Sequence, residues 1–232
     1  MIIGLTGLYC AGKNHIALVL EKQGIPVLDA DKLGHKVIAG ETESIVRLFG
    51  NGILDGNGKI DRKLLGRMVF GRPKELACLE AIVHPRVDSL IEEWLAGNRE
   101  FPVSVINAAL LQKSSVFGKF DAIIAVKAPF PVRLFRAVRR DKLPFGEILK
   151  RMTSQKDFPR FKNKSDPSKL FFGAADIYVI QNSGISGSRK ELEKRIETIL
   201  KGLCNGKEKT TACRGFGGSV SGNRLQRGDF NY

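Results

Sequence analysis

Short apolar runs that stop at turn residues alternate with segments of helical periodicity over the first two hundred residues. Ile2–Thr6 is an apolar run that ends at Gly7, which is typical of a buried parallel strand. Apolar residues at helical spacing then predict a helix over 13–23, and a second short strand is expected at 25–28. The order of strand, glycine turn, helix and strand predicts a doubly wound parallel sheet within a three-layer α/β/α fold.

A long helical stretch separates this opening unit from the later strands. Residues 32–96 have mostly helical periodicity, and Pro85 is expected to kink or divide the last of these helices. The remaining elements are expected, in chain order, as strands at 103–108 and 122–126, a strongly basic helical region at 131–156, a strand at 177–180 and an amphipathic helix at 190–203. From Cys204 onward Gly, Ser, Lys, Arg and Asn replace the periodic pattern, so we expect a disordered basic tail.

The charge balance and the cysteines narrow the possible partners. With 38 Lys and Arg against 24 Asp and Glu, the formal net charge is +14, which suits phosphate-rich ligands. The basic residues are scattered and lack an aromatic RNA-binding motif, so nucleic acid is only a weak alternative. The four cysteines have no metal or disulfide spacing, and no apolar stretch is long enough to span a bilayer. We therefore expect a cytoplasmic protein with reduced thiols that acts on small molecules and not at a membrane.

The turn after the first strand has the spacing of a phosphate-binding loop. Gly7-Leu8-Tyr9-Cys10-Ala11-Gly12-Lys13-Asn14 matches GxxxxGK[ST] at every fixed position but the last. Glycines let the backbone curl so that successive N–H groups point at one phosphate, and the positive end of the following helix adds to the attraction. Lys13 would bring a cation to the β- and γ-phosphates of ATP. The flanking strand and helix favour nucleotide binding over a purely structural turn.

Asn14 stands where a Ser or Thr hydroxyl would normally face Mg²⁺. An amide carbonyl oxygen can also ligate a hard cation. We therefore expect ATP and Mg²⁺ as cofactors, with Asn14 as the candidate metal ligand.

Two carboxylates follow the second strand directly. Ligands bind beyond the carboxyl ends of strands in open parallel sheets, and Asp29 and Asp31 share one face of an extended segment. One of them could accept the proton of an attacking hydroxyl or hold Mg²⁺ through water. Asp31 also precedes a helical stretch and could cap it, which is compatible with catalysis. Asp31 is the stronger candidate for the base.

Several further motifs follow in a fixed order. They are Asp29-Ala30-Asp31 with His35, His84-Pro85, an apolar strand ending in Leu110-Leu111, Arg136 to Arg140-Asp141, Arg151 to Gln155, and Ala175-Asp176 through Asn182 and Gly184. Together with the opening Gly4-Leu5-Thr6-Gly7 they resemble the dephospho-coenzyme A kinase family, which catalyses the last step of coenzyme A biosynthesis. The similarity extends over residues 1–200, and the ordered set is more specific than any single motif.

The resemblance implies an activity and a role for each matching residue. The activity is transfer of the γ-phosphoryl group of ATP to the ribose 3′-hydroxyl of dephospho-coenzyme A. Lys13, Asp31 and Arg140 would be catalytic, as phosphate-binding cation, base and lid cation. The ATP site would comprise Cys10, Ala11, Gly12, Lys13, Asn14, His15 and Asn182, with Asn182 beside the adenine. The acceptor site would comprise Asp29, His84 and Arg136.

Helical spacing separates the basic residues of 131–156 into two groups. Arg136 and Arg140 are one turn apart, so they share a face and could grip a polyphosphate together. Arg133 and Arg139 are interpreted as a solvated face, which is the commoner meaning of a run of charges.

The family fold implies that residues 1–203 form a P-loop kinase domain with two additions. The core would comprise 1–35, 100–130 and 174–203, the helical acceptor-binding insertion 36–99, and the lid 131–173, with the tail 204–232 outside the domain. The central strand departs from the family's Asp-x-Pro-Leu-Leu-x-Glu pattern at Asn107, Ala109 and Lys113, which removes two carboxylates near the acceptor site.

Two alternatives remain open on the sequence. The chain could be another small-molecule P-loop kinase, acting on a nucleoside, a nucleotide or shikimate. It could also be a nucleotide-binding or RNA-associated protein with weakened catalysis, which Asn14, Asn107, Lys113 and the charge of +14 would suit.

Overall fold

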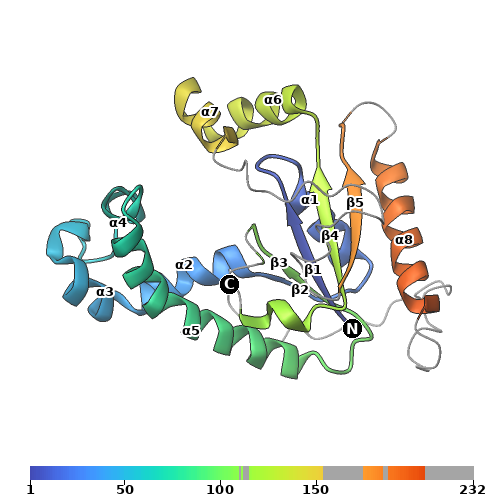
Figure 1. Ribbon diagram of the computed structural model, residues 1–232, viewed down its shortest axis with the longest axis horizontal. Coiled ribbons are helices and arrows are strands. Elements are labelled where there is room, and N and C mark those ends of the chain that lie inside the picture. Colours follow the sequence, from blue (N-terminus) through green and yellow to red (C-terminus); the bar gives the residue numbers. More distant parts are fainter. Residues whose placement is uncertain (110, 112–114, 154–174, 185–187, 207–232) are drawn as a thin grey trace.

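The computed structural model of the protein describes residues 1–109, 111, 115–153, 175–184 and 188–206, and its centre is a parallel β-sheet (Figure 1). The strands are β1 (Ile2–Gly7), β2 (Val27–Asp29), β3 (Ser104–Asn107), β4 (Ala122–Lys127) and β5 (Asp176–Gln181), in the spatial order β2-β3-β1-β4-β5. Every pairing between these strands is parallel, so their carboxyl ends meet at one edge of the sheet. The prediction of a parallel α/β fold is confirmed.

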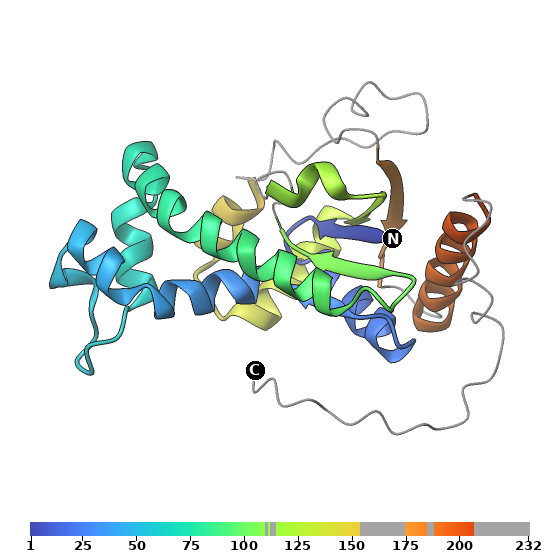
Figure 2. The same cartoon turned by 90° about the horizontal axis from the view of Figure 1, so that it is seen from below.

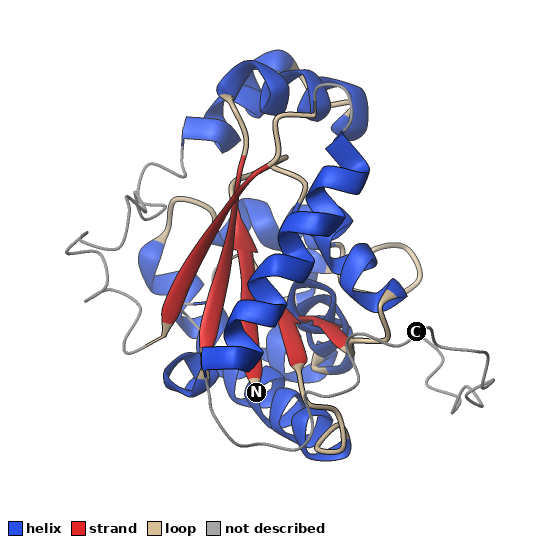
Figure 3. Ribbon diagram, turned by 90° about the vertical axis from the view of Figure 1, so that its right-hand side faces the viewer, coloured by secondary structure: helices blue, strands red, loops and turns tan. Residues whose placement is uncertain are grey.

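Alternate residues of the strands face two separate cores, because successive side chains point to opposite faces of a sheet. Ile124 belongs to the core formed with α1 (Lys13–Lys22) and α8 (Ser188–Gly206). Its neighbour Ile123 belongs to the opposite core, which includes residues of α5 (Pro73–Gly97). Figure 3 shows the sheet with helices in front of it and behind it. Both faces are covered, which explains why the strands are almost continuously apolar.

Four helices between β2 and β3 extend away from the sheet (Figures 1 and 2). They are α2 (Ala30–Gly40), α3 (Thr42–Phe49), α4 (Arg62–Val69) and α5, with the short 3-10 turn η1 (Asn51–Ile53) between α3 and α4. Ile45, Ile53 and Leu65 are buried in a hydrophobic cluster of their own, apart from the two sheet cores. Pro85 was expected to kink or divide the last helix, and it does not divide it, because the 25-residue helix α5 includes Pro85 in its interior.

Two further helices follow β4 and lie beyond the carboxyl ends of the strands (Figure 1). They are α6 (Phe130–Asp141) and α7 (Phe145–Thr153), which share a small apolar cluster that Tyr9 also contacts. α8 ends at Gly206, past the predicted end at 203. Leu110, Lys113, Gln155, the segment 157–172 and the tail beyond 206 lie outside the described residues. Within the described part of the chain, no helix combines the length and apolarity that crossing a bilayer requires.

Candidate active site

The turn between β1 and α1 has the backbone geometry of a phosphate-binding loop. Gly12 is the residue before α1 and has a φ of 97°, in the left-handed region that favours glycine. A Cβ at this position would collide with the side-chain amide of Asn182. The loop is fixed to the sheet by a bond from the Leu8 amide to the Val126 carbonyl, 3.1 Å long. The predicted loop is therefore present and leads directly into the positive end of α1.

Two side chains from distant segments hold the outer side of this loop. Arg136 of α6 donates from Nη1 to the carbonyls of Cys10 and Ala11, at 3.4 and 3.2 Å. Asn182, after β5, donates from Nδ2 to the Ala11 carbonyl at 2.9 Å and accepts from Arg136 Nη2 at 3.3 Å. A trans peptide points its C=O and N–H in opposite directions, so anchoring the Ala11 carbonyl outward leaves the Gly12 N–H facing the phosphate side. The Ala11 N–H is already bonded to the Leu8 carbonyl, at 2.9 Å. Arg136 was expected at the acceptor site, but it contacts the loop.

Lys13 and Asp31 are brought together at the start of the two helices that follow β1 and β2. Lys13 Nζ lies 2.8 Å from Asp31 Oδ2, with the Lys13 side chain 12% exposed and that of Asp31 47% exposed. The other Asp31 oxygen accepts a bond from the Ala109 amide at 3.1 Å. The base candidate thus contacts the loop lysine and the end of β3 at the same time.

Asp29, rather than Asp31, caps α2. Its Oδ1 accepts a hydrogen bond from the Lys32 amide at 3.0 Å, and Asp31 lies in the first turn of the helix. The suggestion that Asp31 is the cap is therefore wrong by two positions. The cap leaves Asp31 free for its contacts with Lys13 and Ala109, since the helix start is already satisfied.

Asn14, the candidate metal ligand, is hydrogen-bonded to the side-chain amide of a second asparagine. Asn107, at the end of β3 and only 2% exposed, donates from Nδ2 to Asn14 Oδ1 at 3.3 Å. The buried Asn107 Oδ1 has no hydrogen-bond partner. Buried carbonyl oxygens are rarely left unpaired, so this one is available to a ligand or its water. The sequence carries no local signal for this pair, because Asn14 and Asn107 are 93 positions apart.

One face of α6 presents arginines to the phosphate-binding loop. Arg140 lies over the Tyr9 ring, 5.4 Å from the centroid, and its Nε is 2.5 Å from Asp141 Oδ1. The Tyr9 hydroxyl donates to the same Asp141 carboxylate. The Arg140 hydrogen bond holds the pKa of Asp141 below its usual range. Burial and the Asp141 carboxylate raise the pKa of Tyr9 to about 12.

Arg133 lies on this same face and is only 8% exposed, so its interpretation as a solvated residue is wrong. Its Nε and Nη1 have no hydrogen-bond partner, and desolvation lowers its pKa. Arg139 is exposed, as expected. Helical spacing alone placed Arg133 outside because it cannot tell which side of a basic helix meets the protein.

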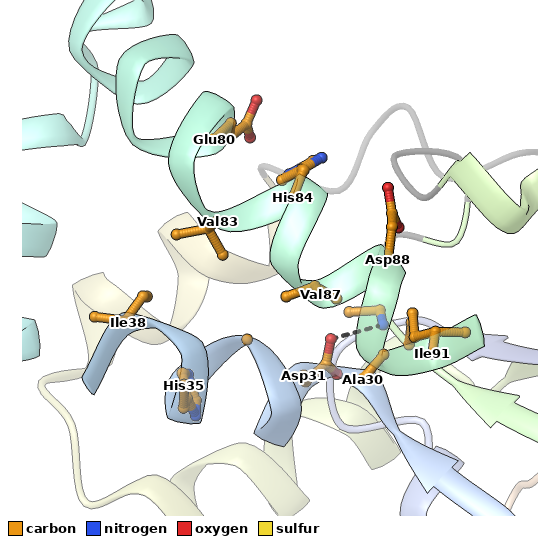
Figure 4. A pocket seen from close by; sticks show the side chains of 13 residues that line it. Ala30, Asp31, His35, Ile38, Glu80, Val83, His84, Val87, Asp88 and Ile91 are labelled. Carbon is orange, nitrogen blue, oxygen red and sulfur yellow. Dashed lines mark hydrogen bonds between the residues drawn. The ribbon is translucent and has the colours of Figure 1, made fainter. Parts of the chain in front are cut away.

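A cavity of about 310 Å³ opens between α2 and α5 beside Asp31 (Figure 4). Its walls are mainly apolar, with Ala30 facing Val87 and Ile91, while His84 contributes a polar edge. His35, one turn beyond Asp31 on α2, also lines it. Asp31 and His84 therefore share one cavity, whereas Asp29 and Arg136 are not among its lining residues. His35 was noted only as part of a motif, although its spacing of four from Asp31 is the signal that links them.

Comparisons with known proteins agree on one family. Residues 1–166 match the family model described as dephospho-CoA kinase. The dephospho-CoA kinase of Thermus thermophilus is 31% identical over 206 residues, which cover 89% of this chain and 93% of that protein. The enzyme of Aquifex aeolicus is 36% identical over 207 residues, which cover 86% and 97%.

Solved structures share the fold of this chain. A crystal structure from Thermus thermophilus has a TM-score of 0.70 at 32% identity, covering 88% of this chain and 97% of that one. A dephospho-CoA kinase from Campylobacter jejuni shares the fold, with a TM-score of 0.55 at 23% identity over 87% and 96% of the two chains. The ordered motifs, the loop geometry and these matches together show that the chain belongs to the dephospho-CoA kinase family.

Proposed function

We propose that this protein transfers the γ-phosphoryl group of ATP to the ribose 3′-hydroxyl of dephospho-coenzyme A, giving coenzyme A and ADP. The observation that carries the proposal is the 2.8 Å contact between Lys13 and Asp31. Lys13 belongs to the phosphate-binding loop and Asp31 lines the apolar cavity, so the donor and acceptor sites meet at this pair. A kinase needs this juxtaposition, because the attacking oxygen must lie in line with the transferred phosphoryl group.

On the donor side, the loop amides and the α1 N-terminus would surround the phosphates of ATP. Lys13 pairs with Asp31 when no nucleotide is present, and its mobile ammonium can turn to the β- and γ-phosphates. Asn182 and Arg136 keep the loop open by holding its carbonyls outward. Asn182 is also the proposed neighbour of the adenine, since it follows β5 beside the loop.

On the acceptor side, Asp31 would accept the proton of the 3′-hydroxyl. The hydrogen bond from Ala109 fixes one carboxylate oxygen, and release of Lys13 to the phosphates exposes the other. The apolar cavity beside Asp31 suits the nucleoside part of the acceptor, and His84 would contact that ligand. Arg140 would leave Asp141 to neutralise charge on the phosphates, as a guanidinium matches planar phosphate oxygens.

The residues near the loop fit a magnesium ion that arrives with ATP. Asn14 Oδ1 and the unpartnered Asn107 Oδ1 are the oxygens that would hold it or its water. Among the described residues, no three His, Cys, Asp or Glu side chains form a metal cluster. The ion would neutralise phosphate charge. Because the two asparagine side chains are uncharged, the phosphates of ATP would contribute most of the affinity for the ion.

The test is ADP release by the purified protein with ATP, Mg²⁺ and dephospho-coenzyme A. Asp31→Asn and Lys13→Ala should each lose at least about a hundredfold in kcat, because base catalysis and charge stabilisation each contribute on that scale. Lys22→Ala, in the last turn of α1, is the control for charge removal from the same helix. Turnover with a nucleotide but none with dephospho-coenzyme A would refute the acceptor assignment. Retained turnover in both variants would refute the site.

A further inference from the structure

We propose that the outer side of α6 binds the surface of a bilayer that contains anionic phospholipid. A row of exposed apolar side chains on this helix, bordered by basic residues, carries the proposal. It goes beyond the proposed reaction, because these side chains lie outside the phosphate-binding loop and outside the lining of the cavity beside Asp31. The expectation that the protein does not act at a membrane came from the lack of a spanning stretch, and adsorption to a bilayer surface needs no such stretch.

The outer side of α6 is apolar although it is exposed. Pro131, Phe135 and Val138 are separated by four and three residues, so they lie in one row along the helix. All three are exposed, Phe135 to 67% and Val138 to 50%. Phe145, the first residue of α7, follows and is 57% exposed. Apolar side chains that are exposed as a group mark interaction sites, whereas single ones are ordinary. These four residues are called the outer stripe.

The stripe faces outward because the opposite side of α6 is held on the phosphate-binding loop. Arg136 bonds to two loop carbonyls from that side, and Ala137 is fully buried in the cluster that Tyr9 contacts. The stripe therefore cannot turn toward the sheet while α6 holds the loop. Figures 1 and 3 show α6 and α7 at one end of the molecule, beyond the carboxyl ends of the strands. A flat surface can approach this end of the molecule before it meets the sheet.

Basic residues border the stripe. Arg139 is four residues after Phe135, and Lys142 is four after Val138, so each lies about one turn from a stripe residue. Both basic residues are exposed. The one carboxylate of α6, Asp141, is already paired with a neighbouring arginine. Aromatic and aliphatic side chains beside Lys and Arg are the composition of helices that lie at the interface of anionic membranes.

Charge also decides against the other partners that an apolar face could have. A second copy of the chain carries the same net charge of +14, and α7 adds Lys150 and Arg151 against Glu147, so two such faces repel each other. A nucleic acid needs a row of cations for its phosphates, yet most arginines of α6 lie on the side of the loop. A bilayer needs only the apolar row and the charges at its border.

The experiment is co-sedimentation of the full chain with vesicles, made either of phosphatidylcholine alone or of equal parts phosphatidylcholine and phosphatidylglycerol. The wild type should bind the anionic vesicles about tenfold more tightly than the neutral ones, and added salt should weaken this binding. The double variant Phe135→Ser with Phe145→Ser should lose about tenfold in affinity, because the apolar area that enters the interface is gone. The double variant Arg139→Gln with Lys142→Asn should lose a similar factor. Asn is chosen at 142 because the backbone there is left-handed, with a φ of 49°.

Matched controls change the same kinds of side chain elsewhere on the surface. Leu18→Ser removes an apolar side chain that is 54% exposed on α1. Arg67→Gln with Lys74→Gln removes two exposed charges from the insertion, so it lowers the net charge as much as the variant at the stripe does. Both controls should bind vesicles as the wild type does. All the substituted residues are exposed, so thermal unfolding and turnover without vesicles should change little in every variant.

Vesicle binding that both stripe variants retain would place the contact outside α6 and overturn the proposal. A loss in the charge variant with none in the apolar variant would mean attraction without insertion and would overturn it as well, as would an equal loss in the controls. Single-stranded RNA that displaces the vesicles and depends on the same residues would assign the stripe to nucleic acid. A dimer in sedimentation equilibrium that the apolar variant dissociates would assign it to a second copy, and either result would refute the membrane assignment.

Discussion

At the scale of single residues, the phosphate-binding loop depends on hydrogen bonds from two side chains of distant segments, which the sequence motifs do not predict. Arg136 donates to the carbonyls of Cys10 and Ala11, and Asn182 also donates to the Ala11 carbonyl. The two side chains are hydrogen-bonded to each other as well. Gly184, with a φ of 70°, lies so close that a Cβ there would collide with Arg136. The loop shape is therefore supported from α6 and from the end of β5.

Arg136→Lys should raise the KM for ATP about tenfold and change the KM for the acceptor by less than about twofold. A lysine ammonium cannot bridge the loop carbonyls and Asn182 as a planar guanidinium does, so about 1 to 2 kcal/mol of support is lost. Steady-state kinetics with each substrate varied would measure both constants. Arg139→Lys, exposed on the same helix, is the control. A rise confined to the acceptor KM would instead place Arg136 at the acceptor site.

Asn107 should show opposite effects on stability and on metal binding. In the wild type, the buried unpaired oxygen of Asn107 destabilises the fold by about 1 to 3 kcal/mol, and leucine removes this penalty. Leucine also loses one amide hydrogen bond, which is worth about 1 kcal/mol. Asn107→Leu is therefore expected to unfold at the same or a higher temperature than wild type. If the oxygen serves magnesium or its water, ATP binding in the presence of Mg²⁺ should weaken while metal-free ATP binding stays unchanged. Calorimetry with and without the ion would show it, and equal effects under both conditions would contradict the assignment.

At the scale of elements, the contact between the loop and α6 includes a titratable pair. The folded protein raises the pKa of Tyr9 to about 12 through burial and the Asp141 carboxylate. An unfolded tyrosine titrates near ~10. Because the folded pKa is the higher one, the protonated hydroxyl contributes stability below about pH 10, and this contribution is lost as the pH rises from 10 to 12.

The Tyr9→Phe variant should therefore lose less stability than wild type between pH 10 and 12. The difference in phenolate absorbance between the two proteins isolates Tyr9 from the two other tyrosines, Tyr178 and Tyr232. In Asp141→Asn, the pKa of Tyr9 should fall toward its usual value, since the carboxylate that disfavours the phenolate is gone. If the pKa of Tyr9 were the same in Asp141→Asn as in the wild type, the two side chains would not be hydrogen-bonded in solution.

Elements with a local signal could be predicted, and contacts between distant elements could not. The strand–loop–helix unit and the candidate residues Lys13 and Asp31 follow from periodicity and spacing, whereas the ion pair between these two side chains does not. The α2 cap was placed at Asp31 instead of Asp29, because helix ends are set by backbone geometry that periodicity does not resolve. The Asn14–Asn107 pair and the Arg136–Asn182 pair depend on strand order in the sheet. Strand order is not written in any single segment of the sequence.

At the scale of the whole molecule, the sheet and the insertion each have an apolar cluster of their own. Ile45, Ile53 and Leu65 are at most 2% exposed in the insertion cluster, and none of them belongs to the sheet cores. Proteins open in cooperative units that often coincide with such clusters. This separation supports the proposed division into a nucleotide-binding core and an acceptor-binding insertion over 36–99 as far as the first half of α5, since Ile91 in the second half belongs to a sheet core. We therefore expect that ATP binding and acceptor binding can each be weakened by mutation without weakening the other.

Ile45→Ala should loosen the insertion while leaving the nucleotide site intact. Ile45 is fully buried, and its truncation should cost about 2 to 5 kcal/mol within its cluster. Hydrogen exchange should then speed up in α3, α4 and the first half of α5 but not in β1 and β4. The KM for dephospho-coenzyme A should rise, with ATP affinity unchanged. Ile124→Ala, equally buried in the sheet, is the counterpart that should impair both sites. Uniform acceleration of exchange in both variants would mean that the insertion and the sheet unfold as one unit, and the division at residue 36 would then have no thermodynamic meaning.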